Sequence, residues 1–341
     1  MKRILLTFKS EIVFLVEESN WAIEWVGNYI THNLRKFYSI NAEIGSQYFA
    51  KRKIIHYGAI TCLFRKNSII NLDKTNNHIL SWHHIPSDET YAKLIRYLNT
   101  KLDLIQTSNI ISKKKLIEFG FEEKKIVVIP LGVDLLKFKR YNKDKRKQLK
   151  KKFELPEDKI IIGSFQKDDW KNGIPVERKG PDIFCEVMEE LNKNFEIHIL
   201  LTGPGRIYIK NRLEKNKIPY THIFLNNYWD VVECYNVLDL YLITSRNEGG
   251  PLALLESMAT GVPVVTTRMG MAPELINNGI NGFITDIDDV KSLYESSVKI
   301  IENDGLREDM IKNAINTVQD YSWEKITKEY YKKIYKRFLE T

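Results

Sequence analysis

The segment with the clearest chemical potential runs from Thr244 to Glu256 and reads Thr-Ser-Arg-Asn-Glu-Gly-Gly-Pro-Leu-Ala-Leu-Leu-Glu. It follows an apolar run that predicts a buried strand, and its proline suits the first turn of a helix. Gly249 and Gly250 let backbone amides approach a ligand closely, and a helix N-terminus behind them attracts anions. Because Glu248 and Glu256 flank these amides, the pattern favours a ligand with both phosphate and hydroxyl groups, such as a sugar nucleotide. A capped helix with two exposed acids would give the same spacing.

Three further loops carry residues of interest. Arg178 and Lys179 precede a predicted helix start and together suit a pyrophosphate clamp, although basic residues are common at such places. Gly203 lies in a Thr-Gly-Pro-Gly-Arg turn that permits close backbone approach but is neither a Walker loop nor a dinucleotide fingerprint. His83 and His84 end a predicted strand and would point to opposite faces, so they are not two ligands of one metal. One of the two would line the ligand-binding cleft, but a buried, hydrogen-bonded histidine explains the pattern equally well.

Two acidic pairs look like metal ligands, but their context argues against that role. Asp286 and Asp288 lie late in the chain in a predicted surface turn, and Asp168 and Asp169 lie in a Gly- and Lys-containing loop expected to be solvated. No His, Cys or Asp cluster has metal-ligand spacing, and no nucleophile elbow is present. We therefore expect no metal site.

Alternating apolar runs and amphipathic stretches must position these loops. Such alternation predicts parallel sheets with crossover helices, which is an α/β architecture, and ligands of such sheets bind beyond the carboxyl ends of the strands. The expected strands are Ile12–Val16, His78–His83, Leu102–Thr107, Lys125–Ile129, Lys159–Ser164, Phe195–Thr202, His222–Leu225, Leu238–Thr244 and Val262–Thr266, and the clearest helices are Ser108–Phe119, Pro181–Leu191, Tyr228–Val237 and Pro251–Ala259.

Composition sets the scale of the molecule. A chain of 341 residues with 43% hydrophobic and 28% charged residues is an ordinary globular protein of about two domains. No apolar run approaches the ~18 residues that cross a bilayer. The three cysteines, Cys62, Cys185 and Cys234, lie far apart, which fits neither a disulfide framework nor a zinc site and suggests a reducing cytoplasm.

The net charge of +8 is unevenly distributed. Residues 1–150 contain 27 Lys and Arg against 14 Asp and Glu, and residues 137–152 contain ten basic residues with one acid. Such asymmetry suggests a partner with an anionic surface, of which a membrane face is one, although lysine-rich solvated surfaces give the same excess. No nucleic-acid-binding module or stacking aromatics accompany the basic run, so we expect no nucleic acid.

Together these residues resemble the retaining glycosyltransferases of family 4, also called glycosyl transferases group 1, whose GT-B fold has two Rossmann-like doubly wound domains facing across a cleft. The most specific match is Asn247–Glu274, with Glu-Gly-Gly-Pro-x4-Glu-x-Met-Ala-x-Gly-Val-Pro-Val-Val and a later Pro-Glu. Ile129–Asp134 with Phe138 resembles the segment that leaves the first domain, and Tyr321–Glu324 resembles the start of the helix that returns to it.

The resemblance implies a domain division and a set of roles. It implies an acceptor-side domain over residues 1–138, completed by a helix at 324–341, a donor domain over 156–323 and a basic linker at 139–155. Glu248, Lys179 and His83 would be the catalytic residues. The residues implied to bind the donor are Glu256 at the ribose, Gly249, Gly250 and Leu252 through their amides, Arg178, and Gly203, Asn227 and Tyr228 around the base.

The activity implied is transfer of a sugar from a nucleotide-diphosphate sugar to an acceptor hydroxyl with retention, without a metal or other cofactor. The implied partners are the nucleotide sugar, a glycan or lipid-linked acceptor and an anionic membrane surface, so the location would be cytoplasmic, at the inner face of the membrane. A nucleotide-sugar epimerase or a non-catalytic GT-B binding protein remains an alternative.

Two departures from the family pattern are visible. Many members have a Gly-Arg pair after the first strand of the second domain, whose arginine holds phosphate, whereas Gly163 is followed here by Ser164. Arg178 is one candidate substitute. The Gly-Gly loop common near the N-terminus is replaced by Ser19-Asn20-Trp21.

Overall fold

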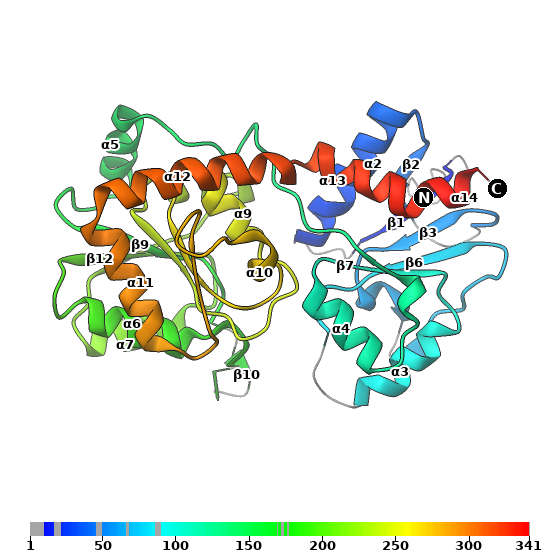
Figure 1. Ribbon diagram of the computed structural model, residues 1–341, viewed down its shortest axis with the longest axis horizontal. Helices are drawn as coiled ribbons and strands as arrows, with labels where there is room; N and C mark the ends of the chain where they lie inside the picture. The colour runs from blue at the N-terminus through cyan, green and yellow to red at the C-terminus, as the bar shows by residue number, and fades with distance from the viewer. Residues whose placement is uncertain are drawn as a thin grey trace. The chain divides into compact units, whose positions relative to one another are not determined.

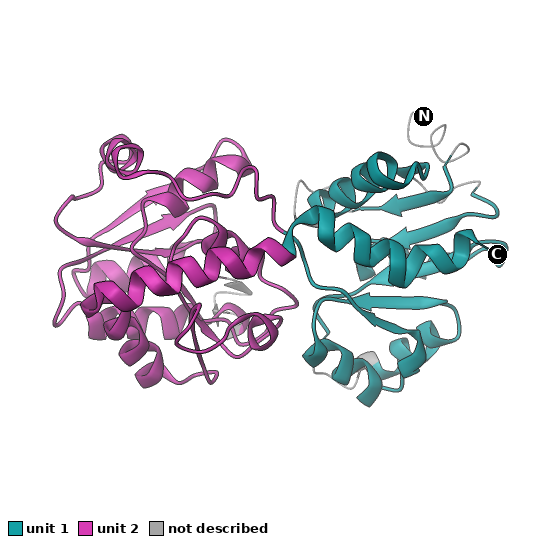
Figure 2. Ribbon diagram, turned by 45° about the horizontal axis from the view of Figure 1, so that its top comes forward, with its two compact units in different colours: residues 1–132, 321–341 teal, residues 133–320 magenta. Residues whose placement is uncertain are grey.

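The structure is a computed structural model that describes residues 10–16, 22–45, 50–65, 68–85, 90–168, 170–171, 174–175 and 177–340. The chain divides into two compact units (Figures 1 and 2). Unit 1 comprises residues 1–132 and 321–341, and unit 2 comprises residues 133–320. Within the described ranges, no helix is long and apolar enough to cross a membrane. The segment Ser19-Asn20-Trp21 lies outside the described residues.

Unit 1 is built on a parallel sheet whose described strands have the order β2-β1-β3-β6-β7-β8. These strands are β1 (Ile12–Leu15), β2 (Ala42–Ile44), β3 (Ile54–Tyr57), β6 (Asn77–Ser81), β7 (Leu104–Thr107) and β8 (Ile126–Val128). The helices are α2 (Ala22–Tyr38), α3 (Thr90–Asn99) and α4 (Ile110–Glu118), and a small hairpin pairs β4 (Phe64–Arg65) with β5 (Ser68–Ile69). Nearly continuous apolar strands are typical of a parallel sheet buried on both faces.

The last residues of the chain complete unit 1. Helix α13 (Trp323–Tyr330) continues through a π-helical turn (Tyr331–Tyr335) into α14 (Lys336–Leu339). The Tyr335 hydroxyl is hydrogen-bonded to His56 Nδ1 at 2.6 Å, and His56 Nε2 contacts the Ser81 hydroxyl at 2.8 Å. These buried contacts tie the C-terminal helix to strands β3 and β6.

Unit 2 contains a second parallel sheet, with the order β13-β12-β9-β14-β15-β16 among the described strands. They are β9 (Ile160–Ser164), β12 (Ile197–Thr202), β13 (Tyr220–Ile223), β14 (Leu240–Ile243), β15 (Val264–Thr267) and β16 (Phe283–Thr285). Helices α6 (Pro181–Leu191), α7 (Ile207–Lys215) and α11 (Val290–Glu302) share one hydrophobic core with it. The remaining helices are α5 (Lys143–Lys152), α8 (Val231–Asn236), α9 (Leu252–Ala259), α10 (Ala272–Leu275) and α12 (Asp304–Val318).

The strand order of unit 2 matters for function. Starting from β9, the chain first adds β12 and β13 on one side and then β14, β15 and β16 on the other. The order therefore reverses between β9 and β14. In doubly wound sheets, this switch point opens a crevice beyond the carboxyl ends of the two strands, where ligands bind.

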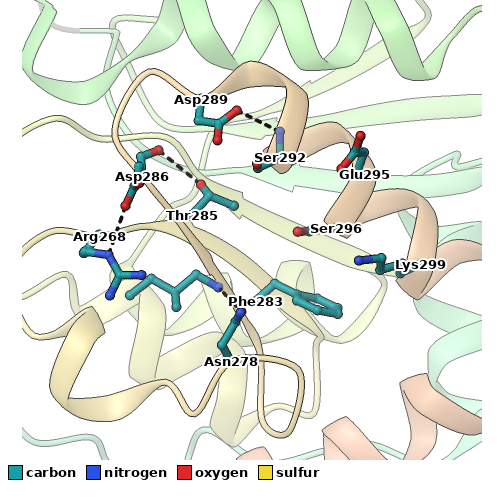
Figure 3. A pocket seen from close by; sticks show the side chains of 11 residues that line it. Arg268, Asn278, Phe283, Thr285, Asp286, Asp289, Ser292, Glu295, Ser296 and Lys299 are labelled. Carbon is teal, nitrogen blue, oxygen red and sulfur yellow. Dashed lines mark hydrogen bonds and ion pairs between the residues drawn. The ribbon is translucent and has the colours of Figure 1, made fainter.

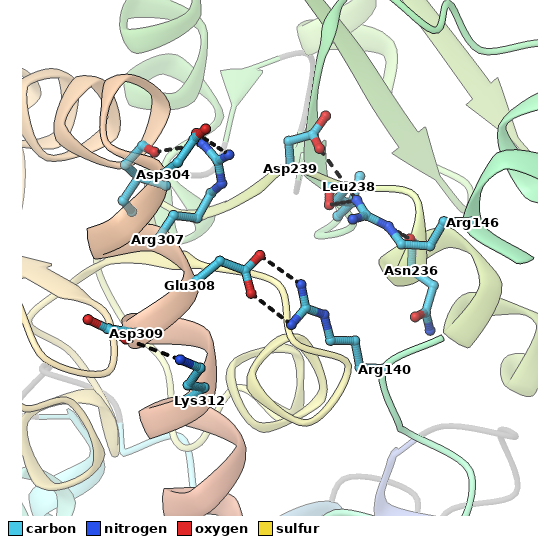
Figure 4. Close-up of polar contacts among 11 residues, drawn as sticks. Arg140, Arg146, Asn236, Leu238, Asp239, Asp304, Arg307, Glu308, Asp309 and Lys312 are labelled. Carbon is cyan, nitrogen blue, oxygen red and sulfur yellow. Dashed lines mark hydrogen bonds and ion pairs between the residues drawn. The ribbon is translucent and has the colours of Figure 1, made fainter. Parts of the chain in front are cut away.

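The basic segment predicted as a linker includes helix α5, which is attached to unit 2. Arg146 donates to the carbonyl oxygens of Asn236 at 2.7 Å and Leu238 at 3.0 Å (Figure 4). Just before the helix, Arg140 makes two hydrogen bonds to the Glu308 carboxylate, at 3.0 and 3.1 Å. These contacts hold residues 140–146 against α12 and the segment that precedes β14.

The predicted α/β class with doubly wound parallel sheets is confirmed, whereas some boundaries differ. The strand expected over His78–His83 ends at Ser81, so the two histidines lie in the following loop. The strand expected over His222–Leu225 begins and ends two residues earlier, as β13.

Candidate functional site

The loops that follow β9 and β14 form a polar cluster at the switch point of unit 2. The Lys179 ammonium forms an ion pair with Oε1 of Glu248, whose side chain is only 6% exposed. The Ser245 hydroxyl lies 3.1 Å from the same oxygen and 2.7 Å from Oε1 of Gln166. We call Gln166, Lys179, Ser245 and Glu248 the Lys179 cluster. A cation, a carboxylate, a hydroxyl and a carboxamide are thus gathered where the sheet topology favours a ligand.

Backbone contacts fix Lys179 beside the end of β14. The carbonyl oxygen of Arg178 accepts hydrogen bonds from the amides of Arg246 at 2.8 Å and Asn247 at 3.2 Å. Gly180 has φ +60°, and a side chain there would collide with the carbonyl oxygen of Thr244. Only glycine combines this left-handed conformation with so close an approach. The local sequence therefore brings Lys179 to Glu248 through the backbone.

The loop that bears Glu248 is also held from outside. Arg246 donates to both carboxylate oxygens of Asp182 on α6, at 2.9 and 2.6 Å, and to Asp288 at 2.6 Å. Gly270 follows β15, and a Cβ there would lie 2.9 Å from the Glu248 carbonyl oxygen. The loop is therefore clamped between α6 and the loops after β15 and β16, which fixes the position of the Glu248 carboxylate.

Glu256 belongs to a second polar group, which we call the Glu256 cluster. Glu256 is 5% exposed, and its carboxyl group accepts hydrogen bonds from the hydroxyls of Tyr228, at Oε1, and Tyr235, at Oε2. Tyr228 comes from the short helical turn Tyr228–Asp230 and Tyr235 from α8. Burial raises the pKa of Glu256 to about 7, although the two tyrosine hydroxyls favour the carboxylate and oppose the shift. Glu256 therefore changes charge near neutral pH.

The other expected donor-binding residues of unit 2 have varied surroundings. Gly249 is buried, Gly250 is half-buried, and Leu252 is the first residue of α9. The Arg178 side chain is exposed. The Gly203 carbonyl oxygen accepts a hydrogen bond from His222 Nε2 at 2.7 Å. The exposed Asn227 caps the turn Tyr228–Asp230. Side-chain contacts join Lys179 with Glu248 and Tyr228 with Glu256. Among the described residues, no side-chain contact joins Gly203 or Asn227 to either pair.

His83 lies in unit 1, in the loop after β6. Its carbonyl oxygen accepts a hydrogen bond from Ser112 at 3.2 Å, and its Nδ1 is buried without a hydrogen-bond partner among the described residues. Burial lowers the pKa of His83 to about 3, and the neighbouring charge of His84 adds to the effect. His83 is therefore neutral at physiological pH.

The expectation that Asp168 is solvated is wrong. Asp168 is completely buried and forms an ion pair with Nε of Arg206 at 2.9 Å. Arg206 is 1% exposed and donates from Nη1 to the Ser164 carbonyl oxygen at 2.7 Å and from Nη2 to its hydroxyl at 3.2 Å. Desolvation of both charges is offset only because they are paired, which the local sequence around Asp168 did not reveal.

The remaining acidic pair is engaged in ion pairs. Asp286 contacts Arg268 at 3.1 Å, and Asp288 contacts Arg246 at 2.6 Å. Asp286 and Arg268 also line a pocket of about 290 Å³ beside β16 and α11 (Figure 3). None of the expected donor-binding residues lines this pocket. In the described part of the chain, no group of three or more His, Cys, Asp and Glu side chains could hold a metal ion.

Three residues of these clusters, and Gly270 beside them, were not singled out from the sequence. Gln166, Ser245 and Tyr235 are ordinary polar residues whose importance appears only when their partners are known. Gly270 lies three residues after β15 and carried only a weak signal, because a glycine in such a loop is compatible with close backbone approach.

Comparison with known proteins identifies the family. The sequence profile of the family described as "Glycosyl transferases group 1" matches residues 145–317, just over half of the chain. The chain therefore belongs to this family of glycosyltransferases, as the resemblance predicted.

Relatives and a solved structure agree with this assignment. An uncharacterized glycosyltransferase of Methanocaldococcus jannaschii is 28% identical over 169 residues, which are 49% of this chain and 44% of that protein, so this match spans less than half of the relative. The capsular polysaccharide biosynthesis glycosyltransferase CapM of Staphylococcus aureus is 24% identical over 73% of this chain and 67% of its own length. The crystal structure of Anabaena HepE in complex with UDP and glucose superposes with a TM-score of 0.78, at 17% identity, over 96% of this chain and 99% of HepE. This last similarity establishes the GT-B fold.

Proposed function

We propose that this protein is a retaining glycosyltransferase that moves a sugar from a nucleotide-diphosphate sugar to an acceptor hydroxyl. The observation that carries the proposal is the pairing of Lys179 with the buried Glu248 at the switch point of unit 2. A cation at this place suits a diphosphate, and a carboxylate suits sugar hydroxyls. The crystal structure of HepE in complex with UDP and glucose supports a donor of this chemical class.

The reaction breaks the bond between the anomeric carbon and the diphosphate oxygen, which leaves with the electron pair. Lys179 and the backbone amides at Gly249 and Gly250 stabilise the negative charge that develops on this leaving group. The acceptor oxygen forms its bond to the anomeric carbon from the same face, and its proton passes to the departing diphosphate. In this scheme, Glu248 orients the donor sugar through its hydroxyls.

The remaining roles follow the family resemblance. Glu256 binds the ribose hydroxyls, and the loops at Gly203 and Asn227–Tyr228 border the base. His83, neutral because its pKa is about 3, contributes an uncharged hydrogen-bonding group beside the donor sugar from the first domain. That domain, residues 1–138 with the returning helix 324–341, receives the acceptor, and residues 156–323 hold the donor.

We further propose that the product is a surface polysaccharide or glycolipid and that the enzyme works at the inner face of an anionic membrane. The role of CapM in capsular polysaccharide biosynthesis supports the first part. The basic excess of residues 1–150 supports the second, because lipid-linked acceptors are presented at a charged surface.

A panel of nucleotide sugars tests the proposed activity. Many glycosyltransferases hydrolyse their donor slowly without an acceptor, so we expect release of free nucleoside diphosphate from at least one member. Release must be lost in a folded Glu248→Gln, Lys179→Ala double variant. An isomerised sugar would indicate an epimerase, and binding without any reaction would indicate a non-catalytic binding protein. Thermal stabilisation across the same panel identifies the donor.

A further inference from the structure

Gln166 has an unused hydrogen-bond donor at the switch point of unit 2. It lies two residues after β9 and three after Gly163, on the loop that faces the end of β14. Its Oε1 accepts a hydrogen bond from Ser245, whereas its Nε2 is buried and has no partner within the described ranges of the chain. Buried amide groups nearly always have a hydrogen-bond partner. An unpaired donor at a ligand-binding edge of the sheet therefore indicates that a bound ligand supplies the acceptor.

The Ser245 hydroxyl occupies the oxygen end of the Gln166 carboxamide. Ser245 has a single hydroxyl proton, and its oxygen lies 2.7 Å from Gln166 Oε1 but 3.1 Å from Glu248 Oε1. In the shorter contact, the Ser245 hydroxyl donates to Gln166 Oε1. The amide oxygen of Gln166 is therefore occupied, and its NH₂ group remains available beside the Lys179 cluster.

Arg206, whose side chain reaches this loop, is engaged elsewhere. The guanidinium of Arg206 reaches the end of β9, but it donates to the carbonyl oxygen and the hydroxyl of Ser164 and is paired with Asp168. All three residues are less than 5% exposed. The place where many family members carry a phosphate-binding arginine thus contains a buried internal network and cannot present a charge to a ligand.

We propose that Gln166 Nε2 donates a hydrogen bond to a diphosphate oxygen of the nucleotide-sugar donor, in place of the missing arginine. This inference rests on the proposed function and names a contact of the same site. Because a carboxamide is uncharged, it positions the diphosphate without adding positive potential, and Lys179 supplies the charge. Donor binding should therefore depend less on salt than it would with an arginine at position 166.

Calorimetric titration of the intact protein tests the contact. UDP, GDP and ADP are titrated first, and the tightest ligand is then used with Gln166→Ala, Gln166→Glu and Gln148→Ala, whose target is an exposed glutamine on α5. We expect Gln166→Ala to weaken binding by about tenfold to a hundredfold, as for loss of a hydrogen bond to a charged group. Gln166→Glu should weaken it further, because it places a carboxylate against an anion, and Gln148→Ala should have no effect.

The variant Gln166→Arg provides a gain-of-function control. It should bind the same nucleoside diphosphate at least as tightly as the wild type and with a steeper salt dependence. Binding by folded Gln166→Ala that equals wild-type binding would overturn the inference, while wild-type binding of the nucleotide would leave the proposed function intact. Equal losses in Gln166→Ala and Gln166→Arg would also overturn it, because they would assign Gln166 a structural role. A wild type that binds none of the three nucleotides would count against the proposed function itself.

Discussion

Tyr228 donates its hydroxyl to one oxygen of Glu256, and Tyr235 donates to the other at 3.0 Å. Both oxygens of this buried carboxyl group are therefore satisfied before any ligand arrives. Tyr235 is fully enclosed, whereas Tyr228 is half-buried on a short helical turn. A ribose that binds Glu256 would therefore share the carboxylate with the hydroxyl of Tyr228 or replace that hydroxyl.

Stability should depend on the protonation of Glu256. Its pKa is about 7 in the folded protein and near 4.5 when unfolded, so the folded state binds the proton more tightly. The resulting stabilisation is fully present below pH 4.5 and is lost as pH rises through about 7. Over that window, the wild type should lose on the order of 3 kcal/mol relative to Glu256→Gln, which cannot titrate.

Thermal unfolding of both proteins from pH 4 to pH 9 measures this difference. The comparison cancels the contribution of the buried histidines His56 and His83, whose pKa values are lowered to about 3 in the folded state and which act in both proteins. If the stabilities of the two proteins changed with pH in parallel, the pKa of the Glu256 carboxyl group would be the same in the folded and unfolded states.

Glu256→Ala should mainly raise the apparent KM for the donor. A ribose contact exists in both the ground state and the transition state, so its loss removes uniform binding. Steady-state kinetics over a range of donor concentrations separates the two parameters. A loss confined to kcat would contradict the ribose role and would assign Glu256 to the reacting centre.

Much of the fold was predictable because parallel strands buried on both faces have continuous apolar sequences. Lys159–Ser164 and Phe195–Thr202 were expected as strands and contain the observed β9 (Ile160–Ser164) and β12 (Ile197–Thr202). Shorter strands such as β2 and β16 carry only three residues and were not anticipated. Their strand conformation depends on pairing with β1 and β15, which no local pattern encodes.

The candidate site was partly predictable for a related reason. Glycine and proline mark the loop after β14 in the sequence itself, and so Glu248 and Lys179 could be proposed. Asp168 could not be assigned correctly, since its burial depends on Arg206, 38 positions later. Tyr235 also could not be anticipated, because an aromatic residue on an amphipathic helix usually indicates only a core position.

The pair formed by Asp168 and Arg206 should be important for the stability of unit 2. Asp168→Ala leaves a buried guanidinium without its counter-ion, which should cost about 3–5 kcal/mol. A double variant, Asp168→Leu with Arg206→Met, removes both charges and should be considerably more stable than the single variant. Urea unfolding of the three proteins provides the comparison. A double variant as unstable as Asp168→Ala would show that the ion pair is not the source of the loss.

Association with anionic vesicles should be sensitive to salt and should depend on residues 1–150. The clusters Lys51-Arg52-Lys53 and Lys113-Lys114-Lys115 are the expected contributors, each lysine near such a surface being worth ~1 kcal/mol. Lys113 is paired with Glu123 at 2.7 Å, so the exposed Lys114 is the better residue to substitute in a binding test. Lys114→Glu should reduce co-sedimentation with anionic vesicles at low salt, compared with Lys291→Glu in unit 2. Equal partitioning to neutral and anionic vesicles would exclude this mode of binding.

The two members of the central ion pair should affect turnover rather than donor affinity. If Glu248 orients the sugar as charge develops on its ring, Glu248→Gln should lower kcat more than it raises KM. Lys179→Ala should also lower kcat, because the leaving diphosphate needs its cation most in the transition state. Each loss should be about 2–4 kcal/mol, or tens- to roughly a thousand-fold in rate.

The design must separate these losses from an effect on folding. Lys179→Ala leaves the Glu248 carboxylate buried without its partner, and so it can lower stability as well as rate. A Lys179→Met, Glu248→Gln double variant removes both charges and should recover stability without recovering activity. Circular dichroism and thermal melting must show each variant folded before its kinetics are compared. Near-normal sugar transfer by this folded double variant would mean that the pair only shapes the loop after β14, and the catalytic centre would then have to be sought elsewhere.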